Sequence, residues 1–362
     1  MDLLFSADSH VVETEACYAE IDPRFRERRP RGVEDPDKGA QLVVPGMDFT
    51  IPASMLSRAG VPYENWGLPQ SWSELHPASR DPKARLEIQD EEGVAGEVIY
   101  PSAGMVLCLH PDVEYRKACF EAYNRWLLQF CEADPSRLLG VAQAALPSPE
   151  EGVRELEAIK EMGFRSVMLC GDPAFDDYDQ PSYDPIWEAA VGLNLPVSFH
   201  ILTGKDSYGM AVRGPKTIQQ IVTMRGNQNI MMMMILGGVF DRHPKLKTVM
   251  VESDAGWLPH FAFRLDHNWE RYRWSEEIGA KRPPSEYIDE NVYVTFQDDS
   301  SVRCLREGLR FDRVMWATDF PHGAGTYPHS REVAKRVTEG MTAKQRRSIL
   351  YDNAAALYGL QG

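Results

Sequence analysis

The chain has 362 residues, of which 43% are apolar, so it can bury a full hydrophobic core as one large α/β domain or as two smaller domains. Its formal net charge of -15 argues against nucleic acid or an anionic membrane as a partner, because both require clustered Lys and Arg. The longest apolar stretch, residues 230–238, is too short to span a bilayer.

The first residues and the cysteine pattern indicate the cellular location. The sequence begins directly with an apolar, strand-like run and lacks the basic region and cleavage pattern of a signal peptide. Its 6 cysteines are scattered without the short paired spacings of zinc or redox motifs. We therefore expect reduced thiols and a cytoplasmic protein.

Strand-like runs alternate with helical periodicity along most of the chain. The first strand lies within residues 3–13, and an irregular stretch rich in Pro, Gly and aromatic residues follows over 14–80. Because a structureless loop of that length is unusual in a compact domain, we expect an ordered insertion that covers a site or contacts another subunit. Seven further strands are predicted at 96–102, 138–144, 165–171, 196–200, 247–252, 292–296 and 314–319. Helices are predicted at 82–92, 114–131, 149–161, 183–193, 217–237, 257–272, 330–339, 342–351 and 353–358.

This order of elements predicts an α/β fold. Strands that read as buried rather than strictly alternating, each followed by a helix, favour a parallel, TIM-like (β/α)₈ barrel that forms one domain over residues 1–362. A doubly wound open sheet is the alternative, but no Gly-rich fingerprint follows the first strand. In a (β/α)₈ barrel the active site lies where the strands end.

Ionisable residues follow several of the predicted strands at that point. Asp8 and His10 end the first strand, His200 ends the fifth, and Glu252 and Asp319 end the sixth and eighth. Each follows an apolar run, where an ionisable side chain without a partner would be costly. Mixed nitrogen and oxygen donors suit Zn, Mn or Fe better than Mg or Ca. The pattern therefore predicts a site for a divalent metal ion.

Two further acidic residues lie near these strand ends. Glu13 follows the first strand closely enough to return from its loop and complete the ligand set, although it could instead begin an ordinary surface helix. Asp254 follows the sixth strand, and we expect it to cap the helix that comes next.

Five pieces of the sequence resemble the amidohydrolase-related group of the amidohydrolase superfamily. The metal-dependent members of this group include hydrolases and non-oxidative decarboxylases of aromatic or unsaturated carboxylic acids. The resemblance runs from the first strand to the last helix, and the insertion is the part least covered. The pieces are ADSHVVE (7–13), SFHILTG (198–204), HPKLK running into VESDAGWLP (243–259), ATDFPH (317–322) and NAAALYG (353–359).

By that resemblance His200 and Asp319 take the family's metal-ligand positions, and the implied cofactor is one or two divalent ions (Zn, Mn or Fe) per chain. The first strand departs from the commonest family pattern, His-x-His, because Asp8 and His10 occupy its end. Glu252 stands where many relatives have a catalytic histidine, which weakens a direct transfer of the decarboxylase mechanism.

The resemblance implies a metal-dependent hydrolase or carboxy-lyase that acts on a small aromatic or unsaturated carboxylic substrate. In the hydrolytic version Asp319 is the base and Glu252 a second acid/base or a ligand. In the decarboxylative version an acid protonates the ring carbon. His322 is expected either to contact the substrate or to orient Asp319.

Two other functions remain open from the residues alone. If Glu13 and Glu252 both join the other four predicted ligands, the site could hold two iron or manganese ions and activate dioxygen, as in a dinuclear oxygenase that hydroxylates its substrate. Alternatively, the barrel could be a catalytically inactive partner subunit, which would bind little metal.

The aromatic residues of the insertion bear on substrate binding and assembly. Phe49, Tyr63, Trp66 and Trp72 are expected to supply an apolar lid over the site. The apolar insertion and its Trp-rich surface predict a homo-oligomer such as a dimer. The expected partner is a small-molecule substrate, without nucleic acid or membrane.

Overall fold

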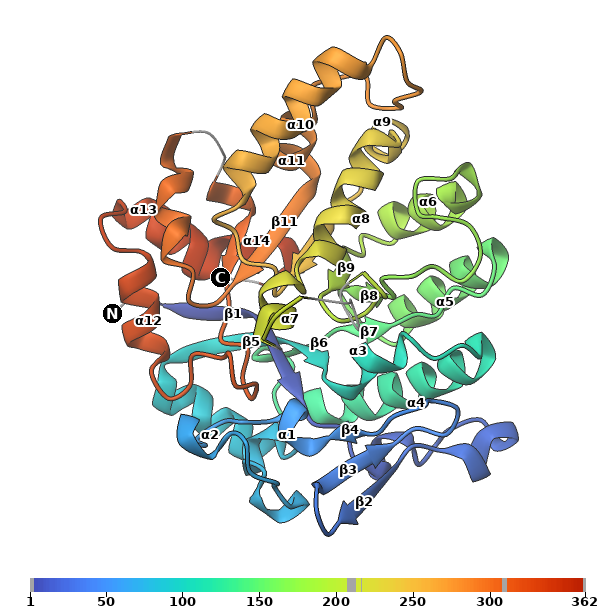
Figure 1. Cartoon of the computed structure of the whole chain (residues 1–362), viewed down its shortest axis with the longest axis vertical. Helices are drawn as coiled ribbons and strands as arrows, with labels where there is room; N and C mark the ends of the chain where they lie inside the picture. Colours follow the sequence, from blue (N-terminus) through green and yellow to red (C-terminus); the bar gives the residue numbers. More distant parts are fainter. Residues whose placement is uncertain (1–2, 207–212, 216, 308–310, 361–362) are drawn as a thin grey trace.

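The computed structural model describes residues 3–206, 213–215, 217–307 and 311–360 of the chain, and the side chain of Cys304 lies outside this description. The described strands form three sheets, and helices flank the two parallel sheets (Figure 1). Within the described residues, no helix combines the length and apolarity needed to cross a bilayer. The five cysteines whose side chains are described are all buried free thiols, as expected.

The two parallel sheets contain every strand predicted from the sequence. One has the order β1-β5-β6 and the other the order β12-β11-β10-β9-β8-β7. Their strands are almost entirely buried, which explains why their sequences do not alternate between polar and apolar residues. The bounds are β1 (Leu4–Val11), β5 (Val94–Pro101), β6 (Leu138–Gly140), β7 (Ala142–Gln143), β8 (Val167–Leu169), β9 (Val197–His200), β10 (Thr248–Val251), β11 (Val292–Phe296) and β12 (Val314–Trp316). The chain therefore has an α/β fold with parallel sheets.

The predicted third strand is shared between the two parallel sheets. Only Val141 separates β6 from β7, and its N–H donates to the carbonyl of Ile99 in β5 at 2.9 Å. The next residue, Ala142, donates instead to the carbonyl of Ser166, just before β8, at 3.3 Å. One continuous segment therefore carries the hydrogen-bonded ladder from the first sheet into the second.

The opposite edges of the two sheets also meet, at β1 and β12. The N–H of His10 in β1 donates to the carbonyl of Phe320 at 2.6 Å, and the N–H of Asp319 donates to the carbonyl of Asp8 at 3.0 Å. Residues 319 and 320 follow β12 directly, so backbone bonds link β1 to the far edge of the six-stranded sheet. These bonds place the ends of β1 and β12 side by side.

Long helices lie between the strands as predicted, and local signals explain their ends. Asp81 accepts a hydrogen bond from Lys83 N–H at 2.9 Å at the start of α2, and Gly93 ends α2 in the left-handed region with a φ of 71°. Ser148 caps α5 and is followed by Pro149. The main helices are α2 (Pro82–Glu92), α4 (Val113–Cys131), α5 (Pro149–Glu161), α6 (Asp184–Gly192), α10 (Leu258–Tyr272), α12 (Ser330–Val337) and α14 (Asn353–Tyr358).

Two predicted helices are broken in the structure. The helix expected over 217–237 is two helices, α7 (Thr217–Val222) and α8 (Arg225–Leu236). Between them Thr223 bonds through its hydroxyl to the carbonyl of Gln220 at 2.8 Å, a local side-chain bond that competes with helix continuation. The helix expected over 342–351 changes from α13 (Ala343–Arg347) to a π-helical turn at Ser348–Asp352.

Four short helices of four to eight residues were not predicted, because so few residues show little of a helical period. They are α1 (Ala53–Leu56), α3 (Ala103–Leu107), α9 (Val239–Arg242) and α11 (Pro284–Asn291).

Residues 14–80 are ordered around a small antiparallel sheet, coloured blue at the bottom of Figure 1. Its strands are β2 (Arg31–Asp35), β3 (Gly39–Val43) and β4 (Ile51–Pro52), and short 3₁₀ helices connect the remainder. Gly39 has a φ of 73°, which the tight β2–β3 turn requires. Leu42 and Ile51 are 0% and 1% exposed, so this segment has its own buried side chains within the core.

A buried ion pair fixes the outer side of β1. Arg85 on α2 is 1% exposed and contacts Glu97 Oε1 at 2.9 Å, and it also donates to the carbonyls of Ala78 at 2.7 Å and of His10. Replacing Arg85 by Met would leave a buried carboxylate without its partner. We expect the free energy of unfolding to fall by about 3–5 kcal/mol, measured by urea denaturation. In contrast, Arg24→Met at an exposed ion pair should leave the unfolding midpoint unchanged.

Candidate metal centre

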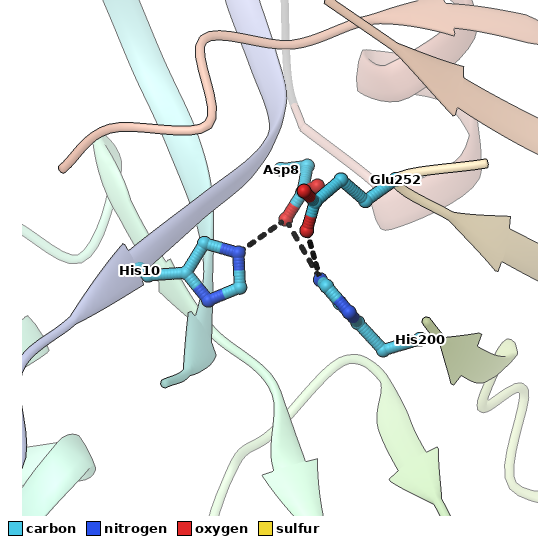
Figure 2. A group of neighbouring side chains, drawn as sticks. All are labelled: Asp8, His10, His200 and Glu252. Carbon is cyan, nitrogen blue, oxygen red and sulfur yellow. Dashed lines mark ion pairs between the residues drawn. The ribbon is translucent and has the colours of Figure 1, made fainter. Parts of the chain in front are cut away.

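The carboxyl ends of four strands bring the predicted ligands together. Asp8 and His10 come from β1, His200 from β9, and Glu252 and Asp319 from the turns after β10 and β12. Figure 2 shows the side chains of Asp8, His10, His200 and Glu252 pointing toward one another. Glu252 and Asp319 have φ values of 54° and 53°, a left-handed conformation that costs energy for non-glycine residues and is concentrated at functional sites. The backbone is thus turned specifically to present these two carboxylates.

The facing atoms lie within ion-pair distance. His10 Nε2 is 3.3 Å from Asp8 Oδ1 and 3.3 Å from Asp319 Oδ1. His200 Nε2 is 3.6 Å from Asp8 Oδ1 and 3.6 Å from Glu252 Oε2. The side chains of Asp8, His10, His200 and Asp319 are fully buried, whereas that of Glu252 is 14% exposed. Glu252 is therefore the member of this group on the solvent side.

Both imidazole rings are oriented by backbone carbonyls. His10 Nδ1 lies 2.8 Å from the carbonyl oxygen of Pro101, and His200 Nδ1 lies 3.1 Å from that of Ile201. Since a carbonyl oxygen only accepts, each Nδ1 carries a proton, so Nε2 is the nitrogen that can direct a lone pair at a bound ion. This is the arrangement of histidines that bind metal ions.

Five buried oxygen and nitrogen atoms of this cluster have no hydrogen-bond partner and could bind an ion. They are both carboxylate oxygens of Asp8, Nε2 of His10 and His200, and Oδ2 of Asp319. Unsatisfied buried acceptors are costly, and a set that converges on one point needs a cation rather than another acceptor. Two imidazoles with carboxylates are donors that fit a divalent transition metal. The residues present therefore fit the predicted ion.

The pKa directions describe a cluster that is short of positive charge. Burial acts to raise the pKa of Asp8, but His10 and His200 lower it well below its usual range. Burial acts to lower the pKa of His10, and the carboxylates of Asp8 and Asp319 raise it well above its usual range. Burial and the neighbouring carboxylates of Asp319 and Asp8 raise the pKa of Glu252.

The structure does not bring Glu13 to this cluster. Its carboxylate is 0% exposed and accepts the N–H groups of Ser102, Ala103 and Gly104 at 3.1, 2.8 and 2.7 Å. Neither group of possible ligand atoms within the described residues contains Glu13. Its oxygens are occupied by the backbone at the start of α3, so the expectation that Glu13 completes the ligand set is corrected.

His322 lies beside the centre and contacts Asp319, as one of its two expected roles requires. Its Nδ1 is 2.9 Å from Asp319 Oδ1, and its Nε2 is 3.0 Å from Ser102 Oγ. The ring lies 4.0 Å from that of His10, measured between centroids. Burial and the charge of His10 lower the pKa of His322. Both of its nitrogens are occupied, so a second ion bound through His322 would have to break these bonds.

Within the described residues, possible ligand atoms fall into two overlapping groups that share His10 and Glu252. The groups are Asp8, His10, His200, Glu252 and His10, Glu252, Asp319, His322. Because His10 and Glu252 belong to both, and His322 is already bonded on both nitrogens, the arrangement offers one ion a better ligand set than two.

A cavity of about 260 Å³ adjoins the centre at His322. Arg58, Tyr63 and Trp66 of the 14–80 segment line it, together with Tyr327. Arg58 Nη1 is buried without a hydrogen-bond partner, and the Arg58 N–H donates to the carbonyl of Pro321 at 2.8 Å. Arg58 could not be predicted as a cavity residue, because an Arg within an irregular stretch carries no periodic signal.

Two other expectations about residues near the site differ from the structure. Of the predicted lid residues, Phe49 and Trp72 are not among the residues that line this cavity, and Trp72 packs on Gly32 instead. Asp254 does not cap the following helix. No side chain caps α10, whose N-cap residue is Trp257. Asp299 Oδ2 accepts the N–H groups of Ala255 and Gly256, in the turn before the helix, at 3.1 and 2.7 Å.

Known proteins are similar to this chain in sequence and in fold. The chain is 24% identical over 311 residues to gamma-resorcylate decarboxylase of Polaromonas sp. strain JS666. This match covers 80% of this chain and 91% of that protein. An amidohydrolase structure from Mycobacterium avium subsp. paratuberculosis K-10 has a TM-score of 0.80 at 22% identity, with 99% of each chain covered. The dihydroxybenzoic acid decarboxylase structure from Polaromonas sp. JS666, with bound manganese and the inhibitor 2-nitroresorcinol, has a TM-score of 0.69 at 20% identity and covers 99% of this chain and 98% of that one.

A family model decides the assignment. The model described as amidohydrolase matches residues 89–360, which is most of the chain and includes three of the four strand ends that form the centre. The first strand lies outside the matched range, but its residues Asp8 and His10 belong to the same cluster. The chain belongs to the amidohydrolase family.

Proposed function

We propose that this protein is a metal-dependent, non-oxidative decarboxylase of a small aromatic or unsaturated carboxylic acid. The observation that carries the proposal is the set of five buried, unpartnered atoms that could bind an ion, beside a cavity that Arg58 lines. The similarity to decarboxylases of dihydroxybenzoates supports it.

Four fully buried residues would hold the ion, namely Asp8, His10, His200 and Asp319. Glu252, which belongs to both groups of possible ligand atoms, lies beside them on the solvent side. Manganese is the first ion to test, because it is bound in a similar structure. When bound, the ion supplies positive charge that neutralises the carboxylate and an adjacent oxygen of the substrate.

The protein's own side chains would do the remaining work. Arg58, which lines the cavity, would bind an anionic or hydroxyl group of the substrate there. Glu252, the most exposed member of the cluster, would donate a proton to the ring carbon that bears the carboxylate. The bond to the carboxylate then breaks, CO₂ leaves, and the electron pair of that bond returns to the ring.

The ligand geometry favours this reaction over the alternatives. A dinuclear oxygenase needs a second set of ligands, but Glu13 is bound to backbone N–H groups and His322 to Ser102 and Asp319. An inactive subunit has no need for five buried atoms that lack partners, since each of them costs stability. Hydrolysis would use the same ion, and the assay below separates it from decarboxylation.

The test is a substrate screen on manganese-loaded protein. We expect CO₂ release from benzoates with a hydroxyl group next to the carboxylate, and none from benzoate itself. Chromatography should show the matching phenol as the product. Hydrolysis of aryl esters or amides without any decarboxylation would contradict the proposal.

We further propose that the two parallel sheets close into one (β/α)₈ barrel, with 14–80 as an insertion that covers its mouth. The backbone bonds between β1 and the segment after β12 support closure, and the contact between Arg58 and Pro321 supports the cover.

Exposed apolar residues such as Leu68 and Trp274, 58% and 80% exposed, support a homo-oligomer such as a dimer. Buried free thiols are in keeping with a cytoplasmic location. Light scattering measures the assembly state directly.

A further inference from the structure

The clearest feature without a role so far is the segment between β5 and α3. Ser102 follows β5, is 1% exposed, and lies directly before α3. Its side chain does not cap that helix. Instead, Ser102 Oγ lies 3.0 Å from Nε2 of His322, which comes from the other end of the chain. A serine at the start of a helix normally bonds to the helix backbone, so this contact needs another explanation.

Glu13 replaces the missing cap. Its two carboxylate oxygens accept the N–H groups of Ser102, Ala103 and Gly104, at 2.7 to 3.1 Å. Three charge-assisted bonds to consecutive residues fix the position of this backbone, because they are stronger than neutral hydrogen bonds and leave little rotational freedom. The Ser102 hydroxyl is thereby left free to bond elsewhere.

The same backbone segment orients two imidazoles of the centre. The carbonyl of Pro101 lies 2.8 Å from His10 Nδ1, and the hydroxyl of the next residue, Ser102, contacts His322 Nε2. The two rings lie 4.0 Å apart between centroids, with 31° between their planes. A shift of residues 101–102 would therefore move both rings together.

We propose that Ser102 is a positioning residue for His322, and that Glu13 positions Ser102. The inference rests on the proposed decarboxylase site. His322 Nδ1 faces Asp319 Oδ1 at 2.9 Å, and a carboxylate only accepts, so Nδ1 carries the ring proton. In the neutral ring Nε2 is then an acceptor, and the Ser102 hydroxyl donates to it. This bond selects one tautomer and one ring orientation, which keeps the Nδ1–H group of His322 directed at Asp319 Oδ1.

The first measurement is histidine NMR on ¹⁵N-histidine-labelled protein loaded with Zn²⁺, which is diamagnetic. The His322 resonances are assigned from their loss in His322→Phe. We expect the Nδ1–H tautomer in the wild-type protein and averaged ¹⁵N shifts in Ser102→Ala. Ser136→Ala, at an exposed serine, serves as the matched control and should leave the His322 shifts unchanged. Unchanged His322 shifts in Ser102→Ala would overturn the proposal.

The second measurement is a double-mutant cycle on kcat, with metal content measured for each variant. Loss of one neutral hydrogen bond should lower kcat about three- to tenfold in Ser102→Ala, at unchanged metal content. In a His322→Phe background, Ser102→Ala should have no further effect, since the ring nitrogen is already gone. An equal fold-loss in both backgrounds would show that Ser102 does not act through His322.

Glu13 is tested with two variants, so that a folding defect in one does not decide the outcome. Glu13→Gln offers one acceptor oxygen instead of two, and Glu13→Asp keeps the charge but shortens the reach. Both should produce the His322 spectral change of Ser102→Ala; wild-type His322 shifts in a folded variant would remove Glu13 from the proposal. If the zinc protein shows the expected tautomer but the manganese protein decarboxylates none of the acids screened, the proposed function fails and the positioning role stands.

Discussion

His200→Ala should lose both the bound metal and the activity while the protein stays folded. His200 is fully buried, and its Nε2 directs an unpartnered lone pair at the centre from the end of β9. Alanine removes that ligand without adding a charge. Since the ion supplies several kcal/mol of charge stabilisation, kcat/KM should fall by about 10³-fold or more. Elemental analysis per chain, circular dichroism and the decarboxylation assay give the three readouts.

His260→Ala is the matched control for this experiment. His260 lies on α10, is exposed, and belongs to neither group of possible ligand atoms. Its replacement should leave the metal content near one ion per chain, about the value expected for a single set of ligands. Full metal content and full activity in His200→Ala would mean that the cluster at the strand ends is not the metal centre.

The parts of this site that could be predicted from sequence share one physical basis. A buried strand requires an apolar run, and an ionisable residue at the end of that run must find a partner or a ligand. Asp8, His10, His200 and Asp319 all follow this pattern, and the parallel strands bring them to one edge. Strand direction and burial alone were therefore sufficient to collect residues that lie more than 300 positions apart in the chain, as Asp8 and Asp319 do.

The residues that could not be predicted depend on contacts distant in sequence. Glu13 satisfies the same rule for a buried carboxylate, but its partners are the N–H groups of a helix start 89 to 91 residues later. No local pattern distinguishes a carboxylate that binds backbone N–H groups from one that binds metal. Ser102 and Arg58 were missed for the same reason, because their roles arise from His322 and from the cavity beside it.

Helix boundaries failed where side chains compete with the backbone. The apolar pattern over residues 217–237 predicted one long helix, yet the hydroxyl of Thr223 donates to the carbonyl of Gln220 and the first helix ends at Val222. Such a bond is an option for any Thr in a helix, and only the packing around residues 217–236 decides whether it forms. The break shapes the outer helical layer and leaves the strand ends, and hence the centre, as predicted.

Glu252→Gln should separate proton donation from metal binding. Glutamine has nearly the shape of glutamic acid and keeps one oxygen toward His200, but its amide cannot release a proton at neutral pH. If Glu252 protonates the ring carbon, kcat should fall by about 10²–10⁴-fold with little change in KM. Metal content should stay near that of the wild-type protein, because the four fully buried ligand residues, Asp8, His10, His200 and Asp319, are unchanged.

Asp254→Asn provides the matched control for this variant, two residues further along the same turn. Burial raises the pKa of Asp254 to about 6, and Asp254 belongs to neither group of possible ligand atoms. Its replacement makes the same chemical change to a partly buried carboxyl group but should preserve kcat within about threefold, the spread expected for a residue that does not touch substrate. A Glu252→Gln protein that kept wild-type kcat would exclude Glu252 as the acid. A loss of metal together with kcat would instead identify Glu252 as a fifth ligand and would require the proton to come from the cavity side, where His322 and Tyr327 are among the ionisable side chains that line it.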